Sequence, residues 1–234
     1  MSKDRFSGIV DQYDLWTAID PDYDRIHTRF REALAQELGR IPGEAVTVLE
    51  VGCGTGYTSR IILEADSRVR LETIDRSVGM VARAGAELSG FGERFGIHFG
   101  DMREILPGLG TFPIICSALT IHNLCPDEQR EVYSLVFQRL SPGGLFLSGD
   151  KVSLNDDDAY RETLAIIIRR IEAVRGAHPQ ECAFFLNHER EDDAIRVTES
   201  AVLDMLEQAG FEQVSIGNRA GMHAIINARK GVAK

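Results

Sequence analysis

The chain has 234 residues, of which 44% are hydrophobic and 26% are charged, a balance typical of a folded globular protein that excludes a disordered or fibrous one. Its length favours one α/β domain with an appended segment over two small domains. The formal net charge of -10 argues against a nucleic-acid partner, because proteins that grip phosphate backbones concentrate Lys and Arg.

The cysteines and the N-terminus give expectations about location and metals. The four cysteines are widely spaced and form neither a C-x-x-C pair nor a Cys/His ligand pattern, so we expect no metal site and a cytoplasmic, reduced setting. The first residues lack an apolar signal region, and no run of about 18 apolar residues could cross a bilayer. We therefore expect no export signal and no membrane partner. The oligomeric state is left open, with a homodimer as one option.

Short apolar runs alternate with amphipathic stretches along the first 150 residues. Residues 24–39 carry apolar side chains at steps of four and end at a glycine, which predicts a capped helix. The elements predicted after it are a strand over 46–51, a helix over 58–65, a strand over 69–74, a helix over 77–88, a strand centred on 97–99, a turn of helix over 101–106, a strand over 113–117, a helix over 127–140 and, after a break at 141–144, a strand over 145–148. Five strands with intervening helices predict a parallel, doubly wound sheet, whose ligands bind outside the carboxyl ends of the strands.

The last third of the chain follows a different pattern. Helices are predicted over 158–175 and 198–209, and two apolar runs over 211–216 and 223–228 flank the turn dipeptide Gly217-Asn218. An antiparallel pair would then complete the sheet.

The predicted domain organisation follows from these elements. An N-terminal helical lead-in or lid covers 1–45, and a ligand-binding domain covers 46–234. The stretch from about 151 to 197 would be a helical insertion over the ligand edge of the sheet. Most charges of residues 187–193 are expected to belong to a solvated loop.

A glycine turn connects the first predicted strand to the helix after it. Gly52, Gly54 and Gly56 allow backbone torsions and a close ligand approach that a Cβ would block. A dinucleotide-binding fingerprint would need a glycine where Tyr57 stands, and a phosphate-binding P-loop would need Gly-Lys-Ser/Thr, which is missing. The turn alone is shared by several nucleotide-binding folds, but both phosphate-binding patterns are disfavoured.

Acidic residues follow at the ends of the next two strands. Asp75 ends the second strand, where a carboxylate can accept hydrogen bonds from both hydroxyls of a ribose. Asp101 and Met102 follow the third strand, where an acid beside an apolar side chain could flank the edge and face of an adenine. Three strand ends in register would form one crevice.

The segment 48–56 resembles motif I of the class I methyltransferases that use S-adenosylmethionine (SAM), including the acid at Glu50. The turn 142–144 and the step 206–211 are similar to later segments of that family. The resemblance implies a Rossmann-like sheet of seven strands with a C-terminal antiparallel strand, SAM as cofactor and S-adenosylhomocysteine (SAH) as product. In that family the acid of motif I supports the methionine end of SAM. The cofactor-binding residues implied are Glu50, Gly52, Cys53, Gly54, Gly56, Asp75, Arg76, Met80, Asp101, Met102, Ser117 and His122.

The candidate catalytic residues are His122, Tyr13 and Tyr23. His122 follows the fourth strand, over which the transferable methyl lies in this family, and could act as a general base or orient the acceptor. The alternative is that it packs beneath SAM or bonds to a loop carbonyl. The two tyrosines resemble an aromatic lead-in that covers SAM, whose sulfonium suits electron-rich ring faces. The alternative for them is packing on the edge of the sheet.

The leading functional interpretation is methyl transfer to O, N or C of a small molecule, because the chain has a cap-like insertion and no nucleic-acid module. The substrate-binding candidates are Lys151, His188, Arg190 and Arg219. One alternative is a SAM-consuming enzyme without methyl transfer, either a cyclase or lyase or an enzyme resembling carboxy-SAM synthases, in which Arg190 or Arg219 would bind a carboxylate. The other is a non-catalytic subunit that binds SAM or a partner.

Overall fold

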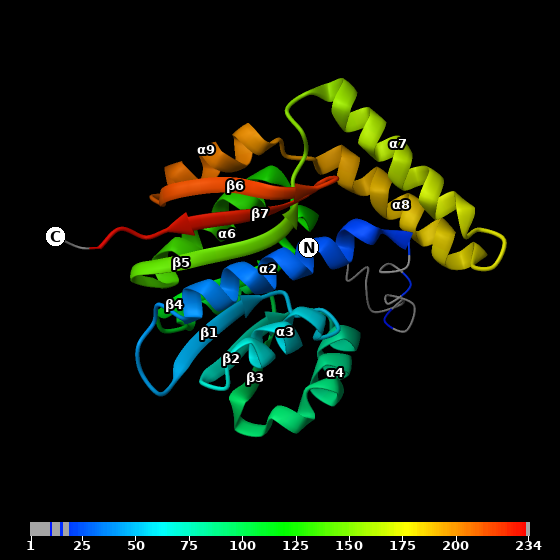
Figure 1. The fold of residues 1–234 in the computed structure, drawn as a ribbon. Coiled ribbons are helices and arrows are strands. Elements are labelled where there is room, and N and C mark those ends of the chain that lie inside the picture. The colour runs from blue at the N-terminus through cyan, green and yellow to red at the C-terminus, as the bar shows by residue number, and fades with distance from the viewer. Residues whose placement is uncertain (1–9, 11–14, 16–18, 233–234) are drawn as a thin grey trace.

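The computed structural model describes residues 10, 15 and 19–232, and a sheet of seven strands forms its centre. The strands are β1 (Val46–Val51), β2 (Val69–Asp75), β3 (Phe95–Phe99), β4 (Phe112–Ala118), β5 (Leu140–Lys151), β6 (Glu212–Ala220) and β7 (His223–Arg229). Their order is β3-β2-β1-β4-β5-β7-β6, and β7 runs antiparallel to both of its neighbours (Figure 1). The predicted doubly wound α/β sheet with a C-terminal antiparallel strand is confirmed.

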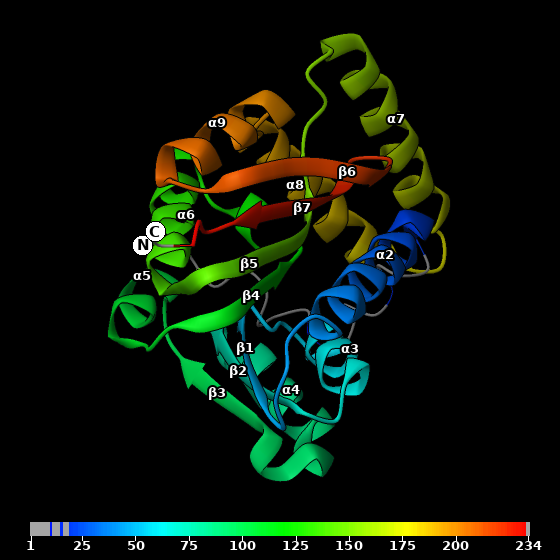
Figure 2. The ribbon, with the colours of Figure 1, turned by 60° about the vertical axis from the view of Figure 1, so that its left-hand side comes forward.

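Helices cover both faces of the sheet (Figure 2). On one face lie α2 (Pro21–Leu38), α3 (Tyr57–Ala65) and α4 (Val78–Glu87), and on the other lie α5 (Met102–Ile105), α6 (Pro126–Arg139) and α9 (Glu199–Ala209). The first face buries Phe30 and Leu34 of α2 against the strands. The second buries Val136 of α6 and Leu206 of α9. The predicted periodicity of the first helix therefore matches the face that it buries.

An insertion of two helices, α7 (Asp157–Ala173) and α8 (Pro179–Ile195), follows β5 and extends beyond the carboxyl ends of the parallel strands (Figure 1). It has a small core of its own, to which Ile171 and Phe185 belong and which Met222 joins from the end of the sheet. The two ends of the insertion lie side by side, because Ser153 and Thr198 form a parallel bridge.

The structure corrects the expectation of a solvated loop over 187–193. These residues belong to α8, and Glu189 and Asp192 are buried. The helix buries positions 182, 185, 189 and 192, which have helical spacing. Since two of these four positions are acidic, the apolar periodicity that identifies a helix in sequence is missing.

Two further boundaries differ from the prediction. β5 begins at Leu140, and the predicted break over 141–144 is a bulge in the strand, because Phe112 pairs with Leu140 and Ile114 with Leu145. The chain reverses at Gly221 instead of Gly217-Asn218, which lies within β6 beside a shift of register. The reversal needs a glycine, since φ is +58° there and a Cβ would approach the Asp22 carboxylate to 2.7 Å.

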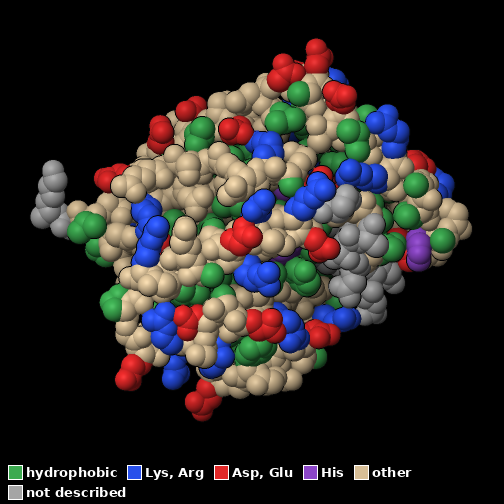
Figure 3. All heavy atoms as spheres, in the orientation of Figure 1, with side chains coloured by type: hydrophobic (Ala, Val, Ile, Leu, Met, Phe, Trp, Pro, Cys, Tyr) green, Lys and Arg blue, Asp and Glu red, His purple; other side chains and the backbone are tan. Residues whose placement is uncertain are grey.

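The surface drawn in Figure 3 carries acidic and basic side chains that are interspersed and not gathered by sign. No helix among the described residues combines the length and apolar character that crossing a bilayer requires.

Candidate functional site

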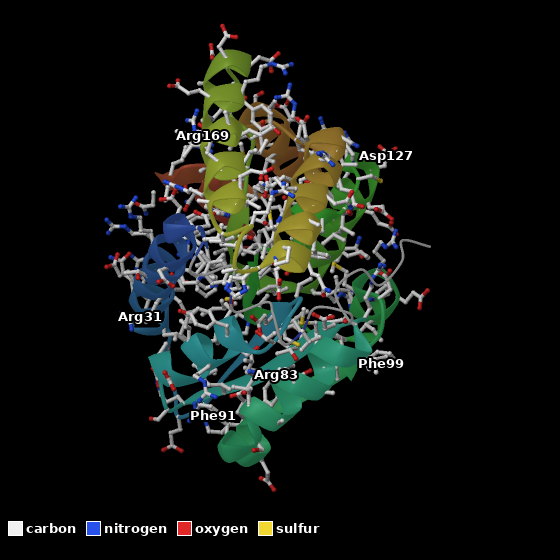
Figure 4. All side chains as sticks on the ribbon, turned by 90° about the vertical axis from the view of Figure 1, so that its right-hand side faces the viewer. Arg31, Arg83, Phe91, Phe99, Asp127 and Arg169 are labelled. Carbon is white, nitrogen blue, oxygen red and sulfur yellow. The ribbon has the colours of Figure 1, made fainter. Side chains whose placement is uncertain are left out.

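A cleft lies at the carboxyl ends of β1, β2, β3 and β4, where parallel strands of a doubly wound sheet place ligands. Figure 4 turns these ends towards the viewer, with α7 and α8 above and α4 below. The cleft is lined by the turn after β1, the segments that follow β2, β3 and β4, and residues of α2 and α3. The three predicted strand ends therefore meet in one crevice.

The glycine turn combines two structural glycines with one that faces the cleft. Gly52 has φ +82°, and a Cβ there would lie 2.3 Å from the Thr120 side chain. Gly56 begins α3 at φ +92° and packs against Ala84 of α4. Gly54 has φ +51°, and a Cβ there would meet nothing within 4 Å. The open space beside Gly54 is where a ligand can approach the backbone.

Asp75 is fixed at the end of β2 by backbone donors. Its Oδ2 accepts a hydrogen bond from the Gly54 N–H at 2.9 Å, and its Oδ1 accepts one from the Ser77 N–H at 2.9 Å. The carboxylate thereby joins the glycine turn to the start of α4. It lines the cleft together with Arg76 and Met80, two further residues that the sequence predicts to bind the cofactor.

Asp101 and Met102 also line the cleft, at the end of β3. Arg103 donates from Nε to Oδ1 at 3.0 Å and from Nη2 to Oδ2 at 2.9 Å, and Arg76 lies 3.4 Å from Oδ2. These hydrogen bonds, above all those from Arg103, lower the pKa of Asp101 to about 2. Asp101 is therefore a permanent carboxylate at this rim of the cleft.

The cleft residues of α2 and α3 form an aromatic wall that sequence reasoning identified only in part. Tyr23 and His27 of α2 contact Tyr57 of α3, with ring centroids 5.8 and 4.8 Å from it. His27 donates from Nδ1 to the Tyr23 carbonyl at 2.8 Å, so its Nε2 accepts from the Thr58 hydroxyl at 3.1 Å. Burial lowers the pKa of His27. The only signal for His27 in the sequence is its place one helical turn after Tyr23. The predicted Tyr13 lies outside the described residues.

Glu50 and Ser117 lie beneath the cleft and do not line it, although both are predicted to bind the cofactor. Ser117 donates to the Val51 carbonyl at 3.0 Å, and the Ser59 hydroxyl donates to Oε2 of Glu50. Burial raises the pKa of Glu50 to about 8. Cys53 does line the cleft, but burial raises the pKa of its thiol far above its usual range, so it is no nucleophile.

The raised pKa of Glu50 gives a testable dependence of stability on pH. Between the ordinary carboxyl pKa of 4.5 and the folded pKa of about 8, the unfolded chain loses the proton and the folded chain keeps it. The free energy of unfolding therefore falls as pH rises through this window. We expect Glu50→Gln to remove that decline and to raise Tm at pH 8 by about 2–4 °C or more relative to wild type, with a smaller gain at pH 5. Thermal unfolding followed by circular dichroism measures both.

The control for this experiment is Glu72→Gln on the neighbouring strand, where the side chain is 39% exposed. We expect its unfolding curves to keep the pH profile of the wild type. Equal effects of the two substitutions would contradict a special role for the buried carboxyl.

A second polar cluster lies around His122, on a short 3-10 turn, η4 (Ile121–Asn123), that follows β4. Its Nδ1 lies 2.5 Å from Oδ1 of Asp150, whose Oδ2 accepts from the Ile121 N–H at 3.0 Å. Its Nε2 faces α8, 3.8 Å from Oδ2 of Asp192, and the same oxygen lies 3.4 Å from Nε2 of His188. His122 borders a smaller second cavity rather than the main cleft. Residues 118–124 thus contribute to the walls of both.

Lys151 brings a buried cation to this cluster. Its Nζ lies 2.7 Å from Oε2 of Glu189 and 3.0 Å from Oδ2 of Asp192. Burial opposes the charged form of Asp192, but Lys151, with smaller contributions from His122 and His188, lowers its pKa to about 2. An ion network therefore connects the helical insertion to β5. Sequence reasoning missed its acidic members, and it also missed Asp150.

The two arginines predicted to bind substrate lie apart from both cavities. Arg190 is exposed on α8. Arg219 donates to the Val152 carbonyl at 2.8 Å and pairs with Glu199, so its charge holds β6 against the base of the insertion. Among the substrate-side candidates, Lys151 and His188 are the ones that the fold brings to the cluster around His122.

Comparisons with known proteins agree on the type of domain. Residues 48–144 match the family described as a methyltransferase domain. The chain is 29% identical over 150 residues to the biotin biosynthesis bifunctional protein BioHC of Teredinibacter turnerae, a match that covers 60% of this chain and 25% of that protein. It is 21% identical over 165 residues to the carboxy-S-adenosyl-L-methionine synthase of Campylobacter lari, covering 70% and 69% of the two chains.

Solved structures share the fold at low sequence identity. The CurJ carbon methyltransferase superposes with a TM-score of 0.68 at 17% identity, over 98% of this chain and 61% of that one. PigF with SAH gives a TM-score of 0.59 at 20% identity, over 79% and 50%. The chain therefore spans a quarter of the length of BioHC and one half to three fifths of these two solved chains.

Proposed function

We propose that this chain, residues 48–144 of which form a class I methyltransferase domain with SAM as its cofactor, transfers the methyl group of SAM to O, N or C of a small molecule. The observation that carries the proposal is the Asp75 carboxylate, fixed by two backbone N–H groups beside the open side of Gly54. A carboxylate held at the end of the second strand suits the two hydroxyls of a ribose.

The remaining residues of the cleft fit the other parts of SAM. Asp101 and Met102 line the cleft one strand further along, where we place the adenine, and Arg76 and Met80 line the same cleft. The backbone around Gly54 supports the methionine part. We assign Glu50, Gly56 and Ser117 the task of holding this wall from behind, because none of the three lines the cleft.

The aromatic wall suits the sulfonium of SAM. Tyr23, His27 and Tyr57 line the cleft, and His27 is neutral at neutral pH because burial lowers its pKa. A cation over an aromatic ring gains about 0.5–2 kcal/mol, and the product SAH has lost the positive charge. The wall therefore favours the reactant over the product, which helps SAH to leave.

We place the acceptor beyond residues 118–124, beneath α8. His122, His188 and Lys151 gather there, and Asp192 and Asp150 complete the cluster. Transfer from a sulfonium is an in-line displacement, so a positioned acceptor and exclusion of water supply much of the rate. Where the acceptor must lose a proton, His122 is the residue that we propose to activate it, through its Nε2.

Mass spectrometry of reactions with SAM and a panel of small acceptors tests the function. We expect SAH to form only with an acceptor, which gains a methyl group. His122→Ala should lower turnover of an acidic O–H or N–H acceptor by about 100-fold or more. Its affinity for SAM should stay within about twofold of wild type, because His122 does not line the cleft.

The matched control is His98→Ala. His98 pairs with Glu72 on the sheet and is not part of the cluster around His122. It should keep wild-type turnover. SAM binding without any methylated product over a broad panel would contradict the proposal and leave the chain as a SAM-binding subunit.

A second candidate activity is carboxylation of SAM, favoured by the match to carboxy-S-adenosyl-L-methionine synthase over 69% of that enzyme. Such an enzyme needs a cation for a carboxylate. Lys151 and Arg196 border the second cavity, but Lys151 is paired with two acids and Arg196 pairs with Asp157. These pairings favour methyl transfer. Mass spectra of SAM incubated with a carboxylic-acid donor and no methyl acceptor decide, because this activity would transfer a carboxyl group from the donor to SAM and yield carboxylated SAM.

A further inference from the structure

Three ligating atoms converge between η4 and α8: Nε2 of His122, and the side chains of His188 and Asp192. All lie within 4.8 Å of one another. His188 and Asp192 are one helical turn apart on α8, so both project from the same face. The sequence predicts no metal site because the histidine of η4 stands far along the chain from this pair.

The protonation of His122 determines what its Nε2 can do. The carboxylate of Asp150 only accepts hydrogen bonds, so Nδ1 of His122, 2.5 Å away, carries the proton. The other ring nitrogen, Nε2, then faces α8, 3.8 Å from the Asp192 carboxylate. A cation between them could bind both atoms. An imidazole oriented by a carboxylate in this way is the usual second-shell arrangement of a metal ligand.

The distances fit a small tetrahedral ion. Zinc binds nitrogen and carboxylate oxygen at about 2.0–2.2 Å, which places neighbouring ligands about 3.3–3.6 Å apart. His188 Nε2 and Asp192 Oδ2 are 3.4 Å apart already, His122 Nε2 lies 3.8 Å from the same oxygen, and all three ligand atoms lie within 4.8 Å of one another, so the His122 ring must move inward to close on the ion. The side chains of both histidines are 12–13% exposed, so the site is mostly dry yet can be reached.

The net negative charge of the cluster also favours a divalent cation. Three carboxylates lie in the cluster with the ammonium of Lys151: those of Glu189 and Asp192 pair with its Nζ, and that of Asp150 accepts from its backbone N–H. Two further positive charges would balance them. Lys151 keeps its contact with Glu189 at 2.7 Å when Asp192 binds a metal. Protonation of both histidines is the competing source of charge, and the experiment below separates the two.

We propose that His122, His188 and Asp192 bind a divalent transition-metal ion, with Zn²⁺ the best match to two imidazoles and one carboxylate. Three protein ligands leave a fourth position open, as in catalytic zinc sites. The second cavity borders His122 and Asp192 and gives that position an approach.

The role of the ion rests on the proposed function. An acceptor O–H that binds at the open position loses its proton to solvent, since the metal lowers its pKa. Its lone pair then forms the bond to the methyl group while the carbon–sulfur bond of SAM breaks, and that electron pair stays on the sulfur of SAH. His122 then acts on the acceptor as a ligand of the metal and not as a free base.

Titration of the metal-free protein with Co²⁺ tests the site without any acceptor. We expect visible absorption typical of a four-coordinate ion, saturating at about one equivalent, with no sulfur charge-transfer band from the free cysteines. His188→Ala should weaken Co²⁺ and Zn²⁺ binding on the order of 100-fold, and Asp150→Asn, which acts through His122, by about 10-fold. His98→Ala is the matched control and should bind as wild type does.

Calorimetric measurement of SAM affinity shows that each variant is folded. It also distinguishes failure of the metal site from failure of the proposed methyltransferase function. SAM affinity of His188→Ala should equal that of wild type, because His188 does not line the cleft. Equal Co²⁺ binding by wild type and His188→Ala, or none at all in a protein that binds SAM, overturns the metal site and leaves the methyltransferase proposal intact. Absence of SAM binding with normal Co²⁺ spectra would overturn the function and leave the site.

Discussion

Asp75→Ala is expected to weaken the binding of SAM and SAH by about 100-fold or more. Two charge-assisted hydrogen bonds to the ribose are lost, each of about 1.5–3 kcal/mol, and 1.4 kcal/mol corresponds to a factor of ten. The substitution also removes the hydrogen bond that the Gly54 N–H donates to Asp75 at 2.9 Å. The glycine turn, which we place beneath the methionine part, is then held less firmly. Isothermal titration calorimetry with both nucleosides measures the loss.

Two companion variants make the result specific. Glu72→Ala removes another carboxylate of β2, one that does not line the cleft, and should leave both affinities unchanged. Asp75→Asn keeps an oxygen that can accept one backbone N–H and should fall between wild type and alanine. SAM affinity of Asp75→Ala within threefold of wild type would remove the observation on which the proposed function depends.

Gly52→Ala is expected to lower the free energy of unfolding by about 3 kcal/mol or more. A non-glycine residue in the left-handed region costs about 1–2 kcal/mol. The new methyl would also lie 2.3 Å from the Thr120 side chain, so η4 or the turn must move, and overpacking of this kind costs about 1–3 kcal/mol. Urea denaturation followed by circular dichroism gives the value.

Gly54→Ala is the matched variant, two residues along the same turn. Its φ is also positive, but the added methyl meets no atom of the protein within 4 Å, so we expect a loss of only about 1–2 kcal/mol in stability. The methyl enters the open space of the cleft, and SAM affinity should fall by at least about tenfold. If both variants lost the same stability and Gly54→Ala bound SAM normally, the division between structural and ligand-facing glycines would be wrong.

The central sheet could be predicted because its strands are short runs rich in apolar residues that end at distinctive residues. β1 was predicted with its observed bounds, Val46–Val51, and the acids at 75 and 101 mark the ends of the next two strands. A buried parallel strand can be recognised from its own short stretch of sequence, because that stretch is rich in hydrophobic residues. The turn of the C-terminal hairpin was misplaced for the opposite reason. Gly217-Asn218 has the local composition of a turn, but the close approach of α2 decides in favour of Gly221.

The cluster around His122 was hard to predict because its residues come together only in the folded chain. The acids of α8 look like a solvated charge run in sequence, since nothing in the local pattern places Lys151 beside them. His122 was identified from its place after the fourth strand, but its partner Asp150 comes from β5, and the contact exists only once the sheet has formed. Long-range ion networks leave no periodic pattern for sequence reasoning to detect.

The bridge between Ser153 and Thr198 has a consequence for how such a protein can diversify. The Ser153 N–H donates to the Val197 carbonyl at 3.1 Å and the Glu199 N–H to the Ser153 carbonyl at 2.9 Å, so the chain leaves the sheet and returns to it at adjacent points. A segment with such closely spaced ends can be exchanged as a cassette, because the replacement needs no particular length to rejoin the scaffold. The cofactor cleft uses no residue of α7 or α8 among those described. Under the proposed function, new acceptors can therefore be acquired by substituting one contiguous stretch of the gene, while the residues of the cofactor cleft are inherited unchanged.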